Sequence, residues 1–272
     1  MGIKHILLIS LFILNLWANE RVISLSPSIT EIIYGLNKGN ELVATSSYSL
    51  YPNAAQKLPV IGGYENPNIE KIISYAPTLV VGQSFNRHTL EQLHSFGIKT
   101  LTLNLKRLNS IKKSILILGK ELGAAQDAKI LTNKITNALT TAHKSKKPHS
   151  VMIVYGLRED LRGGIYIAGH DIFFEDIIKA CGNTNAYTAN ATTQPVLSYE
   201  NVIALNPEQI IILHSHATEP NVDVKKALES WYAIPTLAAK NHKISIVDED
   251  YLHIPSQRVA LTIKRLCREM ND

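Results

Sequence analysis

The sequence lacks the short motifs that identify several common enzyme classes. It has no Gly-x-Gly-x-x-Gly after a strand and no Gly-rich loop ending in Gly-Lys-Ser/Thr, so dinucleotide and nucleoside-triphosphate sites are not indicated. It also has no Gly-x-Ser-x-Gly elbow and no His-Glu-x-x-His helix. The pairs Gly62-Gly63 and Gly163-Gly164 are isolated, and we interpret both as turns. An ordinary hydrolase is therefore disfavoured.

The N-terminus lacks both a long membrane span and a lipid-attachment cysteine. Lys4 and His5 precede an uncharged apolar run over residues 6–17, and the small residue Ala18 follows it. This run of about a dozen residues is shorter than the roughly 20 that a membrane-spanning helix needs. We therefore predict a signal peptide over residues 1–18 and export of a mature chain that does not span a membrane. An N-terminal membrane anchor is the alternative.

Cysteine is scarce, with Cys181 and Cys267 as the only two in 272 residues. Both lie in the second half of a chain that we expect to be exported. An oxidising compartment favours a disulfide between them, and two buried free thiols are the alternative.

Charge of one sign is not concentrated anywhere along the chain. The formal net charge is +5, and the densest basic run is Lys144, Lys146 and Lys147 beside Pro148. We interpret this run as a solvated helix end and not as a nucleic-acid-binding patch.

Short β-branched runs alternate with amphipathic stretches along the whole mature chain. Strands are expected over residues 21–25, 42–45, 78–81, 100–103, 150–154, 209–213 and 244–247. Helices are expected over residues 29–36, 67–76, 87–96, 172–180, 199–205 and 258–269. This alternation predicts an α/β fold with parallel, doubly wound sheets.

One short sequence motif occurs in both halves of the chain. Residues 68–73 are followed by Ala76-Pro77 and the strand TLVV, and residues 198–203 by Asn206-Pro207 and the strand QIIIL. Both copies place an acidic residue in the first turn of a short helix, which a proline ends before a buried strand. Two related lobes are the simplest explanation.

A helix is expected between the two halves. Residues 124–146 contain no Gly or Pro and place apolar residues at helical spacing. At 1.5 Å per residue this helix would span about 35 Å. We predict an N-terminal α/β lobe over 19–123, a single long linking helix over 124–147, a C-terminal α/β lobe over 148–272, and a ligand cleft between the lobes. A surface helix within one domain is the alternative.

Two histidines follow a predicted strand. His214 and His216 come directly after residues 209–213, at the sheet edge where open α/β folds place their ligands. Neutral imidazoles there could bind a transition metal, and His88 and His253 lie in loops that could face the same crevice. Exposed loop histidines are the alternative interpretation.

Tyrosines gather in the loops that follow several predicted strands. Tyr48, Tyr51 and Tyr64 follow early strands, and Tyr251 follows the last one. Because such loops face the crevice, these rings suit a flat, partly apolar ligand. Tyr51, next to Pro52, could equally be part of a packed turn. Arg258 opens the last helix and could meet an anionic group.

The ordered motifs of the chain resemble those of a known family. The N-terminal half carries RVISLSPSITEIIYGL and SSYSLYPNAAQKLPVIGGYENPNIEKIISYAPTLVV, and the C-terminal half carries IIKACGNTNAY, LSYENVIALNPEQIII and DEDYLHIPSQRVALTIKRLC. The chain resembles the periplasmic metal-chelate-binding proteins for cobalamin, haem and iron–siderophore complexes, and most of all their cobalamin-binding branch. Cys181 and Cys267 match two cysteines of that branch. Most pocket tryptophans of that branch are replaced here, and the insertion around residues 157–166 is longer.

The resemblance implies both a fold and a function. The fold is two Rossmann-like lobes joined by a rigid helix, with the ligand held between them and no large closure. The implied function is that of a monomeric periplasmic protein that delivers a metal chelate to an ABC importer, made of a permease dimer and ATPase subunits, without catalysing a reaction. Cobalamin is the expected ligand. Haem, a ferric siderophore, or free nickel, cobalt or zinc bound through histidines are the alternatives.

The resemblance also implies roles for individual residues. Tyr48 matches a ring that lines the corrinoid pocket. Tyr64 matches a pocket tryptophan and also the axial tyrosine of the haem binders, and Asp250 matches a pocket acid. Glu70 and Glu200 match acids that meet arginines on the two permease subunits.

Overall fold

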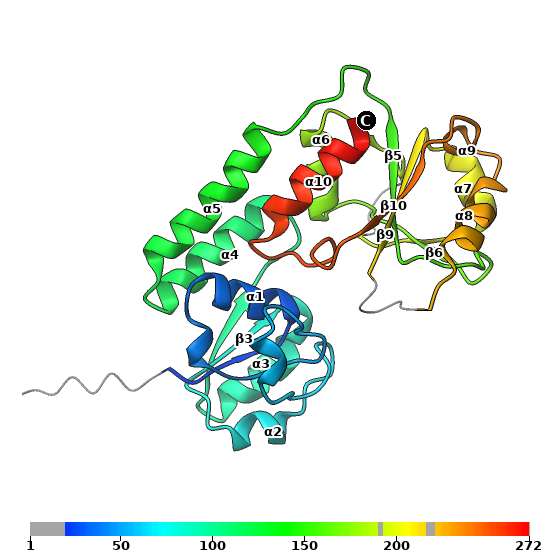
Figure 1. Cartoon of the computed structure of the whole chain (residues 1–272). Helices are drawn as coiled ribbons and strands as arrows, with labels where there is room; N and C mark the ends of the chain where they lie inside the picture. The colour runs from blue at the N-terminus through cyan, green and yellow to red at the C-terminus, as the bar shows by residue number, and fades with distance from the viewer. Residues whose placement is uncertain (1–19, 190–192, 216–220, 272) are drawn as a thin grey trace, which may run out of the picture.

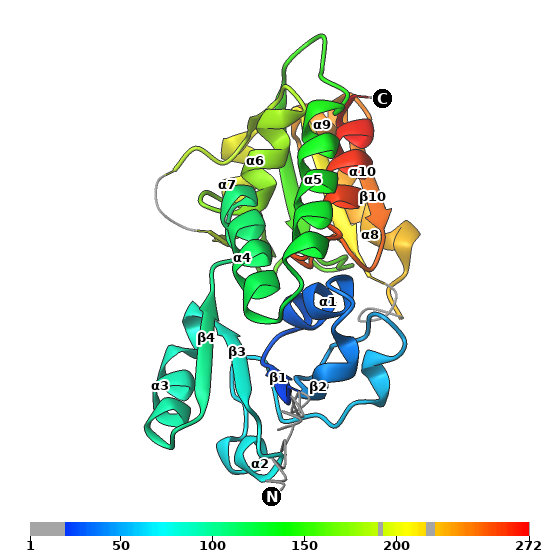
Figure 2. The same cartoon turned by 90° about the vertical axis from the view of Figure 1, so that its left-hand side faces the viewer.

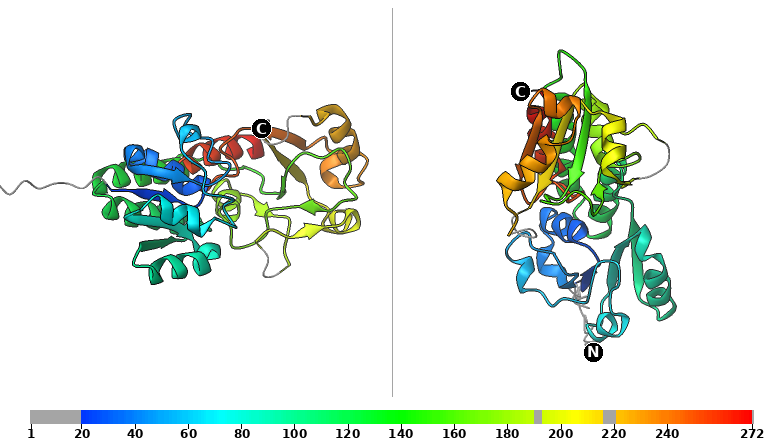
Figure 3. Two further views of the ribbon diagram at one scale, coloured as in Figure 1. Left: turned by 90° about the horizontal axis from the view of Figure 1, so that it is seen from below. Right: turned by 90° about the vertical axis from the view of Figure 1, so that its right-hand side faces the viewer.

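The computed structural model describes residues 20–189, 193–215 and 221–271. The predicted signal peptide and His216 lie outside these ranges. The described residues form two lobes, each built on a four-stranded parallel sheet (Figure 1). Figure 3 shows the two lobes from two further sides. The α/β prediction is confirmed.

The N-terminal lobe has the strand order β2-β1-β3-β4. Its strands are β1 (Val22–Ser24), β2 (Leu42–Thr45), β3 (Leu79–Gln83) and β4 (Lys99–Leu103). Its helices are α1 (Pro27–Gly35), α2 (Ile69–Ser74) and α3 (Arg87–Ser95), with the 3-10 turns η1 (Gly39–Glu41), η2 (Ala55–Lys57) and η3 (Ser84–Asn86). Ser26 caps α1 by accepting a hydrogen bond from the Ile29 amide, and Pro27 occupies the first helical position.

The C-terminal lobe has the strand order β10-β9-β5-β7. Its strands are β5 (Ser150–Tyr155), β7 (Thr184–Asn185), β9 (Gln209–His214) and β10 (Ile244–Asp248), and a separate antiparallel ribbon pairs β6 (Ile165–Tyr166) with β8 (Val196–Leu197). Its helices are α6 (Phe173–Ala180), α7 (Tyr199–Leu205), α8 (Val224–Tyr232), α9 (Leu237–Lys240) and α10 (Val259–Asn271). All six residues of β9 are buried, as expected for a strand covered on both faces.

The repeated sequence motif folds the same way in both lobes. The Asn68 side chain caps α2 and the Ser198 side chain caps α7, each by accepting a hydrogen bond from a backbone amide three residues later. Each helix is followed by a residue with positive φ, Ala76 (43°) or Asn206 (46°), and then by proline and a buried strand. The two copies therefore share one local structure, as the recurring pattern predicted.

The connection between the lobes differs from the single long helix that the sequence predicted. It consists of α4 (Leu108–Glu121) and α5 (Ala125–Thr140), which pack side by side (Figure 2). A Cβ added to Gly119 would lie only 2.4 Å from the Ala128 Cβ, so the close approach of the two helices requires glycine there. The predicted helix is too long, because α5 ends at Thr140 and spans about 24 Å. Residues 141–147, which lie ahead of Pro148, are not helical.

A disulfide closes the C-terminal lobe. Cys181, directly after α6, is bonded to Cys267 in α10, and both residues are buried. The predicted bridge is confirmed. The sequence separation is 86 residues, for which the chain-entropy model gives a stabilisation of at most about 4–5 kcal/mol. Because α10 also packs against α5, the last helix is fixed to both the lobe and the connection.

An ion-pair network joins the start of α4 to the first turn of α6. Arg107 donates to Glu175 (Nη1–Oε2, 2.9 Å) and to Asp176 (Nε–Oδ2, 2.9 Å), and the Leu108 amide also donates to Asp176. Burial alone would raise the pKa of Glu175. Hydrogen bonds from neighbouring groups, that of Lys179 first, and the charge of Arg107 nevertheless hold this pKa at about 2.

The low pKa of Glu175 predicts acid sensitivity. The folded-state pKa lies below the unfolded value of 4.5. The contribution of Glu175 to the free energy of unfolding is therefore complete above pH about 4.5 and is lost as the pH falls toward 2. Glu175→Gln is expected to lower the free energy of unfolding by about 1–2 kcal/mol at pH 7 and by less at pH 3. Urea unfolding at both pH values measures this, with the exposed Glu91→Gln as the control. A loss that is equal at the two pH values would contradict the prediction.

Among the described residues, no helix is both long enough and apolar enough to cross a membrane.

Candidate functional site

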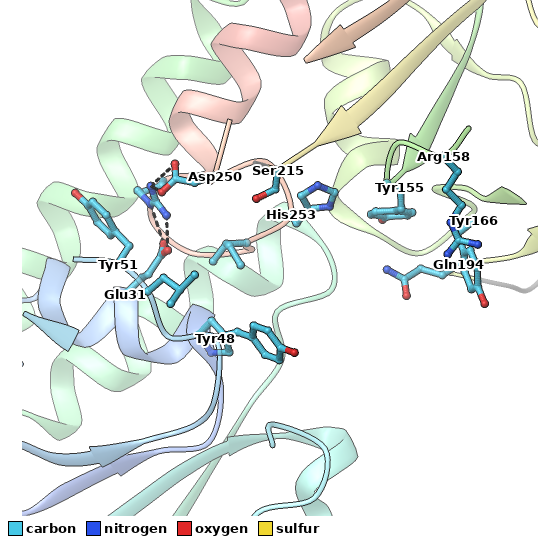
Figure 4. Close-up of a pocket in the computed structure, with 15 residues that line it drawn as sticks. Glu31, Tyr48, Tyr51, Tyr155, Arg158, Tyr166, Gln194, Ser215, Asp250 and His253 are labelled. Carbon is cyan, nitrogen blue, oxygen red and sulfur yellow. Dashed lines mark hydrogen bonds and ion pairs between the residues drawn. The ribbon is translucent and has the colours of Figure 1, made fainter. Parts of the chain in front are cut away.

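A cavity of about 420 Å³ lies between the lobes (Figure 4). This volume falls in the range of small-molecule sites. The N-terminal lobe lines it with Pro27 and Glu31 from α1 and with Tyr48, Leu50 and Tyr51 from the loop after β2. The cavity therefore opens at the carboxyl ends of the strands, where α/β folds place ligands.

Tyr48 is held in place by its own loop. Its backbone has φ of 63°, a left-handed conformation that few residues other than glycine adopt, and its side chain is 66% exposed. Buried hydroxyl groups fix the loop beneath it: Thr45 Oγ1 lies 2.6 Å from Thr30 Oγ1 on α1 and donates to Ser49 Oγ at 2.9 Å. A constrained backbone that presents an exposed ring to a cavity is typical of a ligand contact.

The C-terminal lobe contributes the ends of its two central strands. Tyr155 ends β5 and Ser215 follows β9, and because these strands are parallel neighbours both residues reach the same sheet edge. The Tyr155 ring lies 5.7 Å from that of His253, and burial raises the pKa of the Tyr155 hydroxyl. Farther out, Arg158, Tyr166 and Gln194 form the end wall (Figure 4).

An ion pair joins one lobe to the other at one end of the cavity (Figure 4). Arg258, which precedes α10, donates through Nε to Glu31 Oε2 at 2.9 Å and through Nη1 to both Asp250 oxygens at 3.0 Å. The Glu31 and Arg258 side chains are only 4% and 10% exposed. Burial raises the pKa of Glu31 despite the neighbouring guanidinium. The Tyr51 ring stacks on Arg258, with 3.8 Å between the guanidinium carbon and the ring centroid.

The structure brings together three of the five predicted ligand residues. Tyr48, Asp250 and Arg258 line the cavity, although the charge of Arg258 is already shared by two carboxylates. Tyr64 and Tyr251 are not part of its walls. The Tyr64 ring packs edge-on against Phe85, and burial, followed by the charge of Glu65, raises its pKa. Tyr251 packs against the core.

The predicted histidine pair remains a prediction. His214 is the last residue of β9 and only 2% exposed, and the neighbouring Ser215, not His214, lines the cavity. His216 lies outside the described residues. Within the described ranges, no three His, Cys, Asp or Glu side chains form a group that could hold a metal ion.

Several cavity residues were missed at the level of sequence. Tyr155 directly follows the strand predicted over residues 150–154, so the same argument that selected Tyr48 could have selected it. Arg158 and Tyr166 lie in the insertion that we had noted only for its length. Glu31 interrupts an apolar helical stripe, which is a sign of a buried charge with a distant partner.

The chain is similar to known proteins over most of its length. A family model described as periplasmic binding protein matches residues 22–251. The chain is 28% identical over 277 residues to the vitamin B12-binding protein of Photorhabdus laumondii, covering 100% of this chain and 95% of that protein. It is 27% identical over 270 residues to the vitamin B12-binding protein of Yersinia pestis, covering 97% of this chain and 91% of that protein.

Solved structures agree with this fold. The periplasmic vitamin B12 binding protein of Vibrio cholerae superposes with a TM-score of 0.72 at 25% identity, covering 92% of this chain and 96% of that one. The apo periplasmic haem-binding protein of Roseiflexus sp. RS-1 gives a TM-score of 0.76 at 26% identity, covering 92% and 97%. With its two α/β lobes, its interlobe cavity and a family match over most of its length, the chain belongs to the periplasmic binding protein family.

Proposed function

We propose that this protein captures a metal chelate, cobalamin in particular, and delivers it to an ABC importer without catalysing a reaction. The observation that carries the proposal is the interlobe cavity, walled by tyrosines from both lobes. The vitamin B12-binding names of its relatives support the choice of ligand. In this proposal the chain is exported through the signal peptide at residues 1–18 and works as a monomer in the periplasm.

The chemistry of the cavity suits a macrocycle that carries amide groups. Tyr48, Tyr155 and Tyr166 offer apolar ring faces from different walls, and Gln194 and Ser215 offer hydrogen-bonding groups. A corrinoid can be held by its faces and its amide side chains without any bond from the protein to cobalt. The cavity therefore needs no metal ligand to fit it.

Haem and ferric siderophores fit the cavity less well. Axial haem binding would need a tyrosinate oxygen. Tyr64, the residue expected to supply it, lies outside the cavity walls, and its ring packs edge-on against Phe85. A siderophore is expected to recruit several cationic side chains, whereas the described walls offer two arginines, of which Arg258 is already paired.

Titration of the mature protein with aquocobalamin, hemin and a ferric catecholate tests the ligand. We expect aquocobalamin to bind, and Tyr48→Ala to weaken its affinity about tenfold, because one stacked ring contributes about 1–1.5 kcal/mol. Phe96→Ala is a matched control, since Phe96 is 64% exposed and lies outside the cavity walls. If hemin alone binds, with a charge-transfer band that is lost in Tyr64→Phe, haem replaces cobalamin as the ligand.

The permease contact is proposed to lie at the repeated sequence motif. Glu70 in α2 and Glu200 in α7 are exposed and occupy equivalent positions in the first turns of the two helices. One acid on each lobe suits a partner with two-fold symmetry, because each permease subunit would meet one anchor. The alternative is that each acid only complements its own helix N-terminus.

A further inference from the structure

The insertion between β5 and β6 carries one cation that is not paired. Glu159 pairs with Lys226 (2.7 Å) and Asp160 with Arg162 (2.8 Å), so three of the four charged residues in this insertion have ion-pair partners. Within the described ranges, Arg158 has none. It is nevertheless the residue of the four that lines the cavity.

Arg158 is oriented by an aromatic ring rather than by an acid. Its guanidinium carbon lies 5.1 Å from the centroid of Tyr166, which belongs to β6. This cation–π contact positions the group without neutralising its charge. Figure 4 shows Arg158, Tyr166 and Gln194 together at one end of the cavity.

The opposite end of the cavity is acidic. There Glu31 and Asp250 share the single cation Arg258, which leaves that cluster with a formal charge of −1 when both acids are ionised. Figure 4 places this cluster and Arg158 at opposite ends. The cavity is therefore electrically polarised along its length, and a bound ligand is most stable when its anionic group lies at the Arg158 end.

We propose that Arg158, with Gln194 beside it, is an anion subsite that binds the phosphodiester of a corrinoid's nucleotide loop and so fixes which way the ligand lies in the cavity. This inference rests on the proposed function. A guanidinium presents parallel N–H donors that match two phosphate oxygens, and the Gln194 amide adds a neutral donor. The remaining periphery of the ligand is made of amides, which the tyrosine and serine hydroxyl groups can bind.

The test compares a corrinoid with and without the phosphodiester. Cyanocobalamin carries it, and dicyanocobinamide lacks the nucleotide loop. Arg158→Gln is expected to weaken cyanocobalamin binding about tenfold, to leave dicyanocobinamide unchanged, and to reduce the salt dependence of cyanocobalamin affinity. Arg158→Lys is expected to retain part of the preference. Arg162→Gln, from the same insertion but with its side chain 89% exposed and paired with Asp160, is the matched control and should change neither affinity.

The outcomes separate this inference from the proposed function. If both corrinoids bind and Arg158→Gln weakens them equally or not at all, the phosphodiester subsite is wrong while corrinoid binding stands. If the unmodified protein binds neither corrinoid, the proposed ligand is wrong. Hemin, which carries carboxylate groups, and its dimethyl ester, which does not, then test whether Arg158 binds a carboxylate. A selective loss of hemin binding in Arg158→Gln would make this a carboxylate subsite and would overturn the phosphodiester assignment.

Discussion

Arg258→Gln is expected to destabilise the folded protein by about 3–5 kcal/mol. The substitution removes the guanidinium from the buried Glu31 carboxylate and leaves the Ser256 hydroxyl as its remaining donor within the part of the chain that the structure describes. Removing one partner of a buried ion pair typically costs this much, because the other charge keeps its desolvation penalty and loses its compensation. Urea unfolding at pH 7 measures the loss.

The control and the pH dependence make this expectation specific. Arg265→Gln removes a more exposed pair on α10 and should cost less than about 1 kcal/mol. Burial without the guanidinium raises the pKa of Glu31 further, so the carboxyl takes up a proton more readily in the folded than in the unfolded state. The loss in Arg258→Gln should therefore shrink as the pH falls from 7 to 5. Adding Glu31→Gln to Arg258→Gln should restore part of the stability, and a double variant with simply additive losses would show that the pair is not coupled.

Reversing both proposed docking acids, Glu70→Lys with Glu200→Lys, is expected to reduce uptake at least about tenfold in cells that depend on this protein. Each reversal replaces an attraction with a like-charge repulsion at a subunit contact, which costs several kcal/mol. Ligand affinity should not change, because neither residue lines the cavity. Radiolabelled ligand uptake and calorimetry on the purified variant measure the two quantities.

Matched reversals test whether the positions matter or only the overall charge. Glu91→Lys on α3 and Glu229→Lys on α8 change the net charge equally at exposed sites, one on each lobe. These variants should transport normally. Single reversals at Glu70 or Glu200 should lie between the wild type and the double variant. Undiminished transport by the Glu70/Glu200 double variant would exclude the docking role.

Much of the fold could be predicted because its signals are local. The strand β9 reads as QIIILH, and the helices α2 and α7 carry their caps, acids and terminating prolines within ten residues. The helix α4 was missed although its buried positions Ile111, Ile115 and Leu118 have helical spacing. The end of α5 was placed too late because the absence of Gly and Pro does not by itself keep a segment helical.

The site was harder to predict because its geometry depends on contacts between distant residues. Glu31 and Arg258 are separated by 227 positions, and nothing in the local pattern of either residue specifies the other. Loop residues such as Tyr64 and Tyr251 were correctly placed after strands. Which way their rings point is nevertheless decided by packing partners elsewhere, such as Phe85 for Tyr64. The sequence could therefore locate loops near the cavity, but it could not separate the residues that line the cavity from those that pack against other parts of the protein.

The interlobe connections have a kinetic consequence. The Glu31–Arg258 pair joins the two lobes directly, and the packing of α5 against α10 and the Arg107 network fix the connection to the C-terminal lobe, so the cavity is formed without a ligand. A preformed site needs no conformational change before the ligand binds. We therefore expect the observed association rate to rise in proportion to ligand concentration without reaching a plateau. If the protein delivers its ligand to an importer as proposed, we expect release to require a partner that breaks the Glu31–Arg258 pair and moves the two lobes apart.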